Sequence, residues 1–322
     1  MRPSDDELLE ILRRQGFVMP DRWLSIARDK RFQPVDSVRL TRCLDCDAAL
    51  GPALGHYVYY STLMHLRECS ECGLVHTDAR LADHVVRDHF EQAYKDEEYF
   101  GRRRRAIFRQ LAQVIDEHAP RGGSVLDVGG AKGHMLAVLR DRRPDLRLVV
   151  ADRSATACVH AREVYGFDAL KSTIGELAAL TERFDVVVLS DVLYYEDDLA
   201  RAWPTLAGLL QPKGSLVLRF PNKLGLMRAF QRLGAITGRA TMQTSMPFLN
   251  PEHIHVFSRS YLARRLRRLG FSSVEFMPAA MLEPSLAHRV VATAWHAVAR
   301  AVHRVTGGRV LPTSAMLVVA RL

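Results

Sequence analysis

Residues 125–134 read Val-Leu-Asp-Val-Gly-Gly-Ala-Lys-Gly-His, and this stretch decides the fold. Its apolar start predicts a buried strand, and the glycines that follow predict a tight turn ahead of a helix over 134–143. A glycine turn lets backbone approach a ligand closely, and the first N–H groups of a helix can bind anionic oxygens. A second apolar strand over 146–151 ends at Asp152, whose carboxylate can accept hydrogen bonds from both hydroxyls of a ribose. The segment therefore predicts half of a nucleoside-binding α/β fold.

Two further apolar runs of strand length extend the pattern. Residues 184–189 (FDVVVL) precede Ser190 and Asp191, and residues 215–220 (SLVLRF) follow a predicted turn over 211–214. Strands that alternate with helices predict a parallel sheet, which binds its ligands at the carboxyl ends of the strands. The strict dinucleotide pattern G-x-G-x-x-G is absent, so the order of the elements carries the argument rather than the turn alone.

The ordered motifs resemble the class I S-adenosylmethionine-dependent methyltransferases. Residues 210–222 (LQPKGSLVLRFPN) are similar to the fifth-strand signature of that family, and residues 251–271 (PEHIHVFSRSYLARRLRRLGF) resemble the late histidine-containing segment of one bacterial subgroup. Together the matches span residues 40–322. The resemblance implies an α/β fold with a Rossmann-like, mostly parallel seven-stranded sheet, and an enzyme that transfers a methyl group.

By the same resemblance, the glycine turn and the strand ends hold the cofactor, S-adenosylmethionine. Asp127, Gly129, Gly130 and Gly133 would line its methionine end, and Asp152 would bind its ribose. Further candidate cofactor residues follow the later strands: Arg153, Thr173, Ile174, Ser190 and Asp191. Ala131 stands where the family usually has a third glycine, and its methyl group would narrow the approach to the cofactor.

Catalytic candidates are sought on loops above strand ends, because the acceptor, the methyl group and the sulfur must align. His253 lies at the position of the subgroup's histidine, and a neutral imidazole suits proton abstraction near pH 7. A structural histidine that fixes the loop is an equal alternative. His255 is a weaker candidate, since an alternating strand pattern can bury it. Tyr195 and its neighbour Tyr194 stand where the subgroup often has Glu-His, and either can contact the substrate or form an apolar lid.

Four of the five cysteines form two pairs ahead of these motifs, Cys43-x-x-Cys46 and Cys69-x-x-Cys72. Each pair can supply two thiolates to one tetrahedral ion, and a hairpin over the intervening residues would bring the pairs together. We predict a zinc ribbon with a structural Zn2+, because four thiolates leave no open position for catalysis. The alternatives are four reduced thiols in a small core, or redox chemistry at one pair.

The sequence predicts four parts of the chain. They are an N-terminal helical extension over 1–40, the zinc ribbon over 41–80, a helical linker over 81–120, and the methyltransferase domain over 121–322 with a cap insertion at about 223–250. The four arginines at 102–105 begin a helix, and a solvated helix start is favoured over a grip on the diphosphate of a nucleotide-linked sugar. A helix over 286–305 with one apolar face is predicted to cover the sheet, with binding to a membrane surface as the alternative.

The composition is that of an ordinary globular protein, with 48% hydrophobic and 25% charged residues in a chain of 322. No apolar run is long enough for a transmembrane helix, and the charged N-terminus lacks a signal-peptide core, so we expect a cytoplasmic protein with reduced cysteines. The net charge of +9 is compatible with nucleic acid, an acidic membrane surface or a phosphorylated substrate. Most of the basic residues are arginine, a skew that genome composition can produce, so the charge is weak evidence for any partner.

The leading hypothesis is methyl transfer from S-adenosylmethionine to a small molecule: a sugar, nucleotide-sugar, glycan or natural-product metabolite. The resemblance implies this, because members of the subgroup with a cysteine-paired ribbon are often associated with such biosynthesis. An RNA methyltransferase that binds RNA through the ribbon is disfavoured, since residues 190–195 (SDVLYY) lack the Asn/Asp-Pro-Pro-aromatic motif of many base N-methylating enzymes. A catalytically inactive cofactor-binding protein is a third hypothesis. The N-terminal extension leaves a homodimer open.

Overall fold

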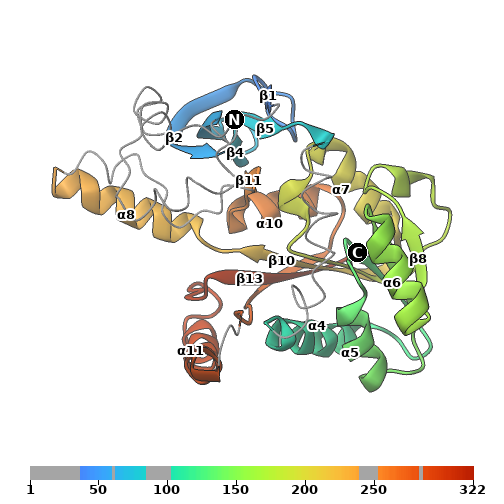
Figure 1. Cartoon of the computed structure of the whole chain (residues 1–322). Helices are drawn as coiled ribbons and strands as arrows, with labels where there is room; N and C mark the ends of the chain where they lie inside the picture. The colour runs from blue at the N-terminus through green and yellow to red at the C-terminus, as the bar shows by residue number, and fades with distance from the viewer. Residues whose placement is uncertain (1–36, 60–61, 85–102, 239–252, 283–285) are drawn as a thin grey trace, which may run out of the picture. The chain divides into compact units, whose positions relative to one another are not determined.

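The computed structural model describes residues 37–59, 62–84, 103–238, 253–282 and 286–322 (Figure 1). The chain divides into two compact units. The first contains the described parts of residues 1–87 and 223–258, and the second contains those of 88–222 and 259–322. The predicted N-terminal helices and most of the predicted linker lie outside the described residues.

The second unit is built on a seven-stranded sheet with the order β12-β13-β10-β9-β6-β7-β8. Its strands are β6 (Ser124–Val128), β7 (Arg147–Asp152), β8 (Asp168–Lys171), β9 (Phe184–Ser190), β10 (Leu210–Pro221), β12 (Ser273–Pro278) and β13 (Ala315–Arg321). The neighbours from β8 to β10 run parallel, and β13 runs antiparallel to both β10 and β12. This arrangement confirms the predicted Rossmann-like, mostly parallel sheet.

The turn predicted over 211–214 is an irregularity inside β10. The strand already pairs with β9 at Leu210, and the register shifts between Leu210 and Ser215 before regular pairing resumes. Lys213 adopts a φ of 67°, a left-handed conformation, and an added Cβ at Gly214 would lie 2.8 Å from the carbonyl oxygen of Gln211. A bulge and a turn use the same residue types, so the sequence alone does not separate them.

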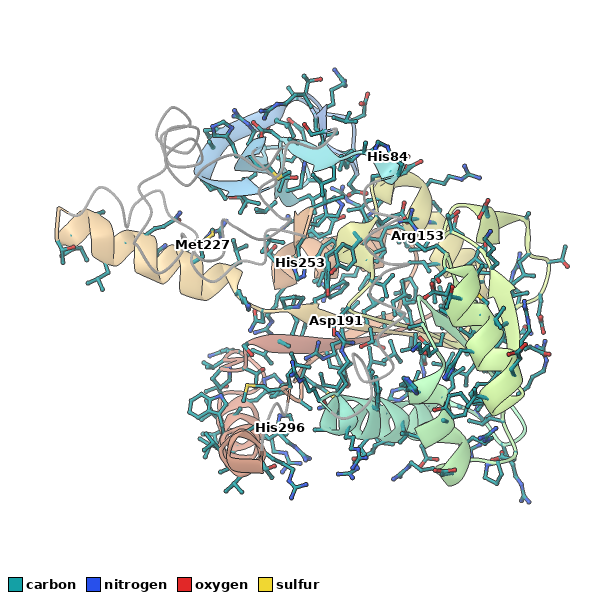
Figure 2. The ribbon with its side chains drawn as sticks, in the orientation of Figure 1. His84, Arg153, Asp191, Met227, His253 and His296 are labelled. Atoms are coloured by element: carbon teal, nitrogen blue, oxygen red, sulfur yellow. The ribbon has the colours of Figure 1, made fainter. Side chains whose placement is uncertain are left out.

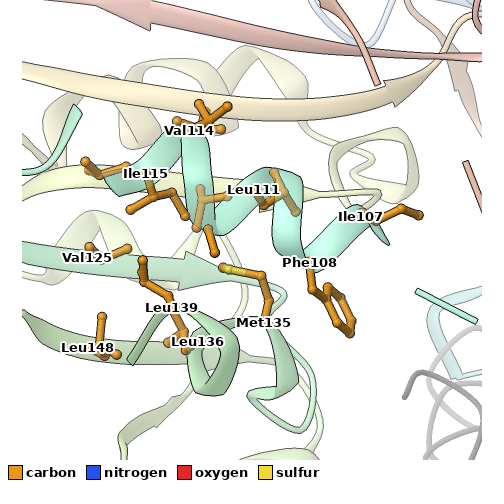
Figure 3. Packing of buried hydrophobic residues seen from close by; sticks show 14 of the residues in the cluster. Ile107, Phe108, Leu111, Val114, Ile115, Val125, Met135, Leu136, Leu139 and Leu148 are labelled. Atoms are coloured by element: carbon orange, nitrogen blue, oxygen red, sulfur yellow. The ribbon is translucent and has the colours of Figure 1, made fainter. Parts of the chain in front are cut away.

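Helices cover the sheet of the second unit. They are α4 (Arg105–His118), α5 (His134–Arg142), α6 (Ala155–Tyr165), α7 (Leu199–Gly208), α10 (Arg259–Arg268) and α11 (Leu286–Val305), with short 3-10 helices η3 (Glu176–Ala179) and η4 (Leu193–Tyr195). In α4, apolar residues recur at helical spacing, and Leu111 and Ile115 pack beside Met135 and Leu136 of α5 (Figure 3). This core holds α5, the helix that follows the glycine turn, against α4.

The local sequence accounts for both ends of α6. The hydroxyl of Ser154 accepts a hydrogen bond from the backbone N–H of Ala157 at 3.2 Å, which caps the start of the helix. Gly166 ends it in a left-handed conformation with a φ of 70°. The Ser154 cap places the start of α6 at Ala155, shortly after Asp152 at the end of β7.

The first unit contains a four-stranded sheet with the order β11-β4-β3-β2. Its strands are β2 (Leu50–Tyr59), β3 (Thr62–Cys69), β4 (Val75–Thr77) and β11 (His255–Val256), and β1 (Ser37–Arg39) pairs separately with β5 (Ala79–Leu81). The antiparallel pairing of β2 with β3 is the hairpin expected between the cysteine pairs.

A helix from the predicted cap insertion belongs to the same unit. Leu224 and Met227 of α8 (Leu224–Ile236) pack in one core with Met64 and Leu66 of β3, and Val256 of β11 joins them. The sequence predicts residues 223–250 as part of the methyltransferase domain, whereas the structure groups the described residues of the range 223–258 with the ribbon. Among the residues described, no helix combines the length and apolarity needed to cross a membrane.

Candidate functional site

The glycine turn after β6 is shaped by close backbone contacts. Gly129 has a φ of 72°, and its N–H donates to the carbonyl oxygen of Ala151 at 2.7 Å, which joins the ends of β6 and β7. An added Cβ at Gly129 would lie 2.4 Å from the side chain of Val192, and one at Gly130 would lie 2.8 Å from the carboxyl group of Asp127. Glycine is therefore required here by the packing of the protein itself, in addition to any ligand.

Ala131, the departure from the family's glycine, adopts a left-handed conformation with a φ of 48°. A residue with a Cβ is strained there, and the strain persists only where neighbouring contacts hold it. One such contact is on its own backbone, since the Ala131 N–H donates to Oδ2 of Asp152 at 2.9 Å. Ala131 thus adopts the left-handed backbone conformation that favours glycine, although it is not a glycine.

Two buried carboxyl groups face this turn. Asp127 and Asp152 are each 3% exposed. Burial, followed by the charge of Asp152, raises the pKa of Asp127 to about 7. Asp152 also accepts from the Ser154 N–H at 2.8 Å, so each of its oxygens is bound by a backbone N–H. Two neighbouring carboxylates repel each other when both are ionised. A cationic ligand would stabilise both charges, so this pair suits such a ligand.

The remaining candidates from the strand ends have different surroundings. Arg153 is exposed (Figure 2). Burial raises the pKa of the Glu196 carboxyl, and the charge of Arg153 lowers that pKa by a smaller amount. Ile174 is 5% exposed, whereas Thr173 is exposed and its hydroxyl bonds Glu176 at 3.0 Å. The N–H of Ser172, the residue before them, donates to the Asp152 carbonyl oxygen at 2.9 Å, which joins the ends of β7 and β8.

Asp191 directly follows β9 (Figure 2). It forms an ion-pair cluster that was not predicted from the sequence. Its carboxylate contacts the guanidinium of Arg219 on β10 and that of Arg104 ahead of α4, the latter at 3.3 Å. Arg219 also donates to the carbonyl oxygen of Ala280 at 2.9 Å. The one available signal was the charged residue inside the apolar strand SLVLRF. The favoured solvated start is wrong for Arg104, whose side chain is 19% exposed.

The tyrosines after β9 differ in burial. Tyr194 is 5% exposed, and burial, aided by the charge of Asp191, raises its pKa well above the ordinary value. Tyr194 is therefore unsuited to act as a base and fits the apolar alternative. Tyr195 is half-buried, with its ring centroid 4.6 Å from that of Tyr194. Val192, between Asp191 and these rings, rests against Gly129, which brings this segment to the glycine turn.

The two candidate histidines lie in the first unit. His255 is 2% exposed and pairs with His76 across the β11–β4 ladder, with ring centroids 5.9 Å apart. His255 is thus buried, as anticipated, but so is its neighbour Val256, so the burial does not come from an alternating strand face. Ile254 separates His253 from the start of β11, and His253 is partly buried (Figure 2). The proposed cofactor residues all lie in the second unit.

The four paired cysteines converge as predicted. Their sulfur atoms all lie within 4.8 Å of one another, with Cys43 and Cys72 at 3.6 Å and Cys46 and Cys69 at 3.5 Å. Four Zn–S bonds of about 2.3 Å place sulfurs about 3.8 Å apart in a tetrahedron, so the cluster fits this ion closely. Burial raises the pKa of Cys46 to about 11, and a divalent cation would offset this cost of ionisation.

A family comparison identifies the class of protein. The second unit has the sheet order and the glycine turn expected of a class I methyltransferase. A family model described as a methyltransferase domain matches residues 99–275, more than half of the chain. The chain therefore belongs to the methyltransferase-domain family and is a methyltransferase. Comparison with curated proteins gives no match.

Several solved structures are similar to this chain. An S-adenosylmethionine-dependent methyltransferase from Archaeoglobus fulgidus has 16% identity and a TM-score of 0.46. The match covers 73% of this chain and 99% of the Archaeoglobus chain. An N-methyltransferase from Bradyrhizobium japonicum, in complex with S-adenosyl-L-homocysteine, has 16% identity and a TM-score of 0.46, with coverages of 73% and 96%. An O-methyltransferase family protein from Burkholderia thailandensis has 17% identity and a TM-score of 0.40; this chain spans 60% of its length and is covered over 74%. At these scores the similarities assign neither an acceptor nor a cofactor site.

Proposed function

We propose that the protein transfers the methyl group of S-adenosylmethionine to a small-molecule acceptor of the sugar, nucleotide-sugar, glycan or natural-product class. Asp127 and Asp152 would hold the cationic donor beside the glycine turn. The observation that carries the acceptor class is the contact of two guanidinium groups, Arg104 and Arg219, with one carboxylate at the end of β9. Arginine binds phosphate and carboxylate oxygens in a bidentate manner, so this cluster suits an acceptor with an anionic group, such as a nucleotide-sugar.

Methyl transfer breaks the S–CH3 bond and forms a bond between the methyl carbon and the acceptor. The sulfur leaves as a neutral thioether, and a hydroxyl acceptor gives its proton to a base. His253 is the proposed base carried over from the sequence. The structure offers Glu196 as a second candidate, because burial raises its pKa to about 7. Glu196 directly follows Tyr195 in the sequence. A carboxyl group that titrates near neutral pH is matched to proton transfer.

The proposed cofactor role is tested by calorimetric titration of the zinc-loaded protein with S-adenosylmethionine and S-adenosylhomocysteine. We expect both to bind, and the Asp152→Ala variant to lose binding. Asp141→Ala is the matched control, because Asp141 is an exposed residue of α5. Absence of binding to the folded wild-type protein would overturn the proposal.

The acceptor is tested with labelled methyl donor and two pools of small molecules, nucleotide-sugars and uncharged sugars. We expect product from the charged pool, with KM raised at least about tenfold in Arg104→Gln and kcat changed less, since a charge-assisted hydrogen bond contributes about 1.5–3 kcal/mol. Equal use of both pools by wild-type and variant would exclude the proposed role of the arginine. Donor binding without turnover on any acceptor would favour the inactive cofactor-binding protein.

A further inference from the structure

Helix α11 exposes a continuous apolar face. Val290, Val291, Trp295, Val298 and Val305 are 66%, 68%, 45%, 51% and 89% exposed. Consecutive members are one, four, three and seven residues apart, which places them on one side of the helix, together with the exposed Ala294. A continuous patch of exposed apolar side chains marks a site of interaction with another surface.

The opposite side of α11 accounts for its packing. Ala292, His296 and His303 are partly buried and Ala299 is fully buried, and these residues recur at helical spacing. Burial lowers the pKa of His296, which also interacts with the backbone of Ala279, directly after β12 (Figure 2). The prediction that α11 covers the sheet therefore holds for this narrow side, while the larger apolar face points away from it.

The charges around the apolar face are all of one sign. Arg289, Arg300 and Arg304 are exposed and lie along one side of the helix, at spacings of eleven and four residues. From residue 284 to residue 322 the sequence contains no aspartate or glutamate. A helix with an apolar face, a tryptophan at its border and arginines alongside has the pattern of helices that lie in the plane of a membrane interface.

We propose that the apolar face of α11 docks the protein on the surface of a bilayer with anionic headgroups. The valines and Trp295 would enter the boundary between headgroups and acyl chains, and the arginines would contact the phosphates. A second copy of the chain is the competing occupant of this face. It fits less well, because pairing two copies of α11 would bring arginines together with no acidic side chain of this segment to oppose them.

The experiment measures binding of the full chain to vesicles. Sedimentation with phosphatidylglycerol–phosphatidylcholine vesicles is compared with sedimentation with phosphatidylcholine alone, at low and high salt. We expect binding to the anionic vesicles that weakens with salt, and a blue shift of tryptophan fluorescence that Trp295→Phe abolishes. Trp203 is fully buried and should not respond.

Two double variants separate this face from the net charge. Val291→Glu with Val298→Glu places two charges on the apolar face and should lower vesicle binding at least about tenfold. Val159→Glu with Val164→Glu adds the same charges at exposed positions of α6 and should keep most of the binding. Circular dichroism checks that both fold.

Three results would overturn the proposal. The wild-type protein could fail to bind anionic vesicles, or both double variants could bind them equally well. Sedimentation equilibrium could instead reveal a dimer that the α11 variant loses, without vesicle binding, which would assign the face to a second copy. None of these outcomes depends on methyl transfer, so the proposal stands apart from the proposed function.

Discussion

The carboxylate of Asp152 accepts a hydrogen bond from the backbone N–H of Ala131 at 2.9 Å, which ties the end of β7 to the glycine turn after β6. Asp152 therefore has a structural role beside its proposed contact with the ribose. Because the buried N–H of Ser154 and the partly buried N–H of Ala131 lose their acceptor, Asp152→Ala should lower the free energy of unfolding by about 1–3 kcal/mol. Thermal denaturation without cofactor measures this, with Asp141→Ala as the control. An unchanged melting temperature would contradict the bond.

Cofactor binding should depend on the ionisation of Asp127. Its pKa of about 7 leaves it largely protonated in slightly acidic solution, whereas a cationic ligand favours the carboxylate. The affinity for S-adenosylmethionine should therefore rise with pH up to about 7 and level off above it. Titration calorimetry across this range measures the effect, and Asp127→Asn should bind weakly without the pH dependence. A wild-type affinity that is flat across pH would count against it.

The same residue makes a prediction for stability. In the protein without cofactor, the folded-state pKa of Asp127 lies above its unfolded value of about 3.9. The stability that protonation contributes is fully present below the unfolded pKa and is lost as pH rises through about 7. Asp127→Asn should therefore raise the melting temperature more at about pH 8 than at about pH 5. An equal effect at both pH values would show that burial does not shift this group.

Substitution of Gly129 should be costly. Gly129→Ala adds a Cβ 2.4 Å from Val192 at a φ of 72°, so both contact and backbone strain oppose it. Chemical denaturation should show a loss of about 1–3 kcal/mol. Gly208→Ala is the matched control, because nothing lies within 4 Å of its added Cβ inside α7, and it should be neutral or stabilising. Adding Val192→Ala should recover part of the loss at Gly129.

Metal removal should act on the first unit. Structural zinc contributes on the order of 10 kcal/mol to the folding of small modules, so Cys69→Ser or a strong chelator should unfold the ribbon. Metal analysis and limited proteolysis measure this. Cys158→Ser, the fifth cysteine, should keep its zinc, because Cys158 bonds backbone carbonyls in the second unit. Full resistance to proteolysis after complete zinc loss would favour the alternative of a packed thiol core.

Local sequence signals were enough to predict the central strands and the cluster of four cysteines. Strands β6, β7 and β9 are short apolar runs; β6 is followed by the glycine turn, and β7 and β9 end at polar residues. The cysteine spacing allows few other geometries. The partners of Asp191 were not predictable in the same way. Arg104 and Arg219 are separated from it by 87 and 28 residues, and only the folded sheet brings them to one point. The outward direction of α11 was also missed, because an amphipathic pattern identifies an apolar face without identifying its partner.

The first unit draws its elements from two separate stretches of sequence, one before the seven-stranded sheet and one between its strands β10 and β12. β4 precedes β6, whereas its partner β11 follows β10. Leu224 and Met227 of α8, which also follows β10, pack on Met64 of β3. Truncation at one point cannot remove the ribbon cleanly. A chain starting at residue 99 would keep β11 and α8 but would lose β4 and β3, on which they pack. Deleting the whole unit would therefore require removal of both stretches of sequence. A minimal catalytic sheet would have to rejoin Asn222 directly to Arg259.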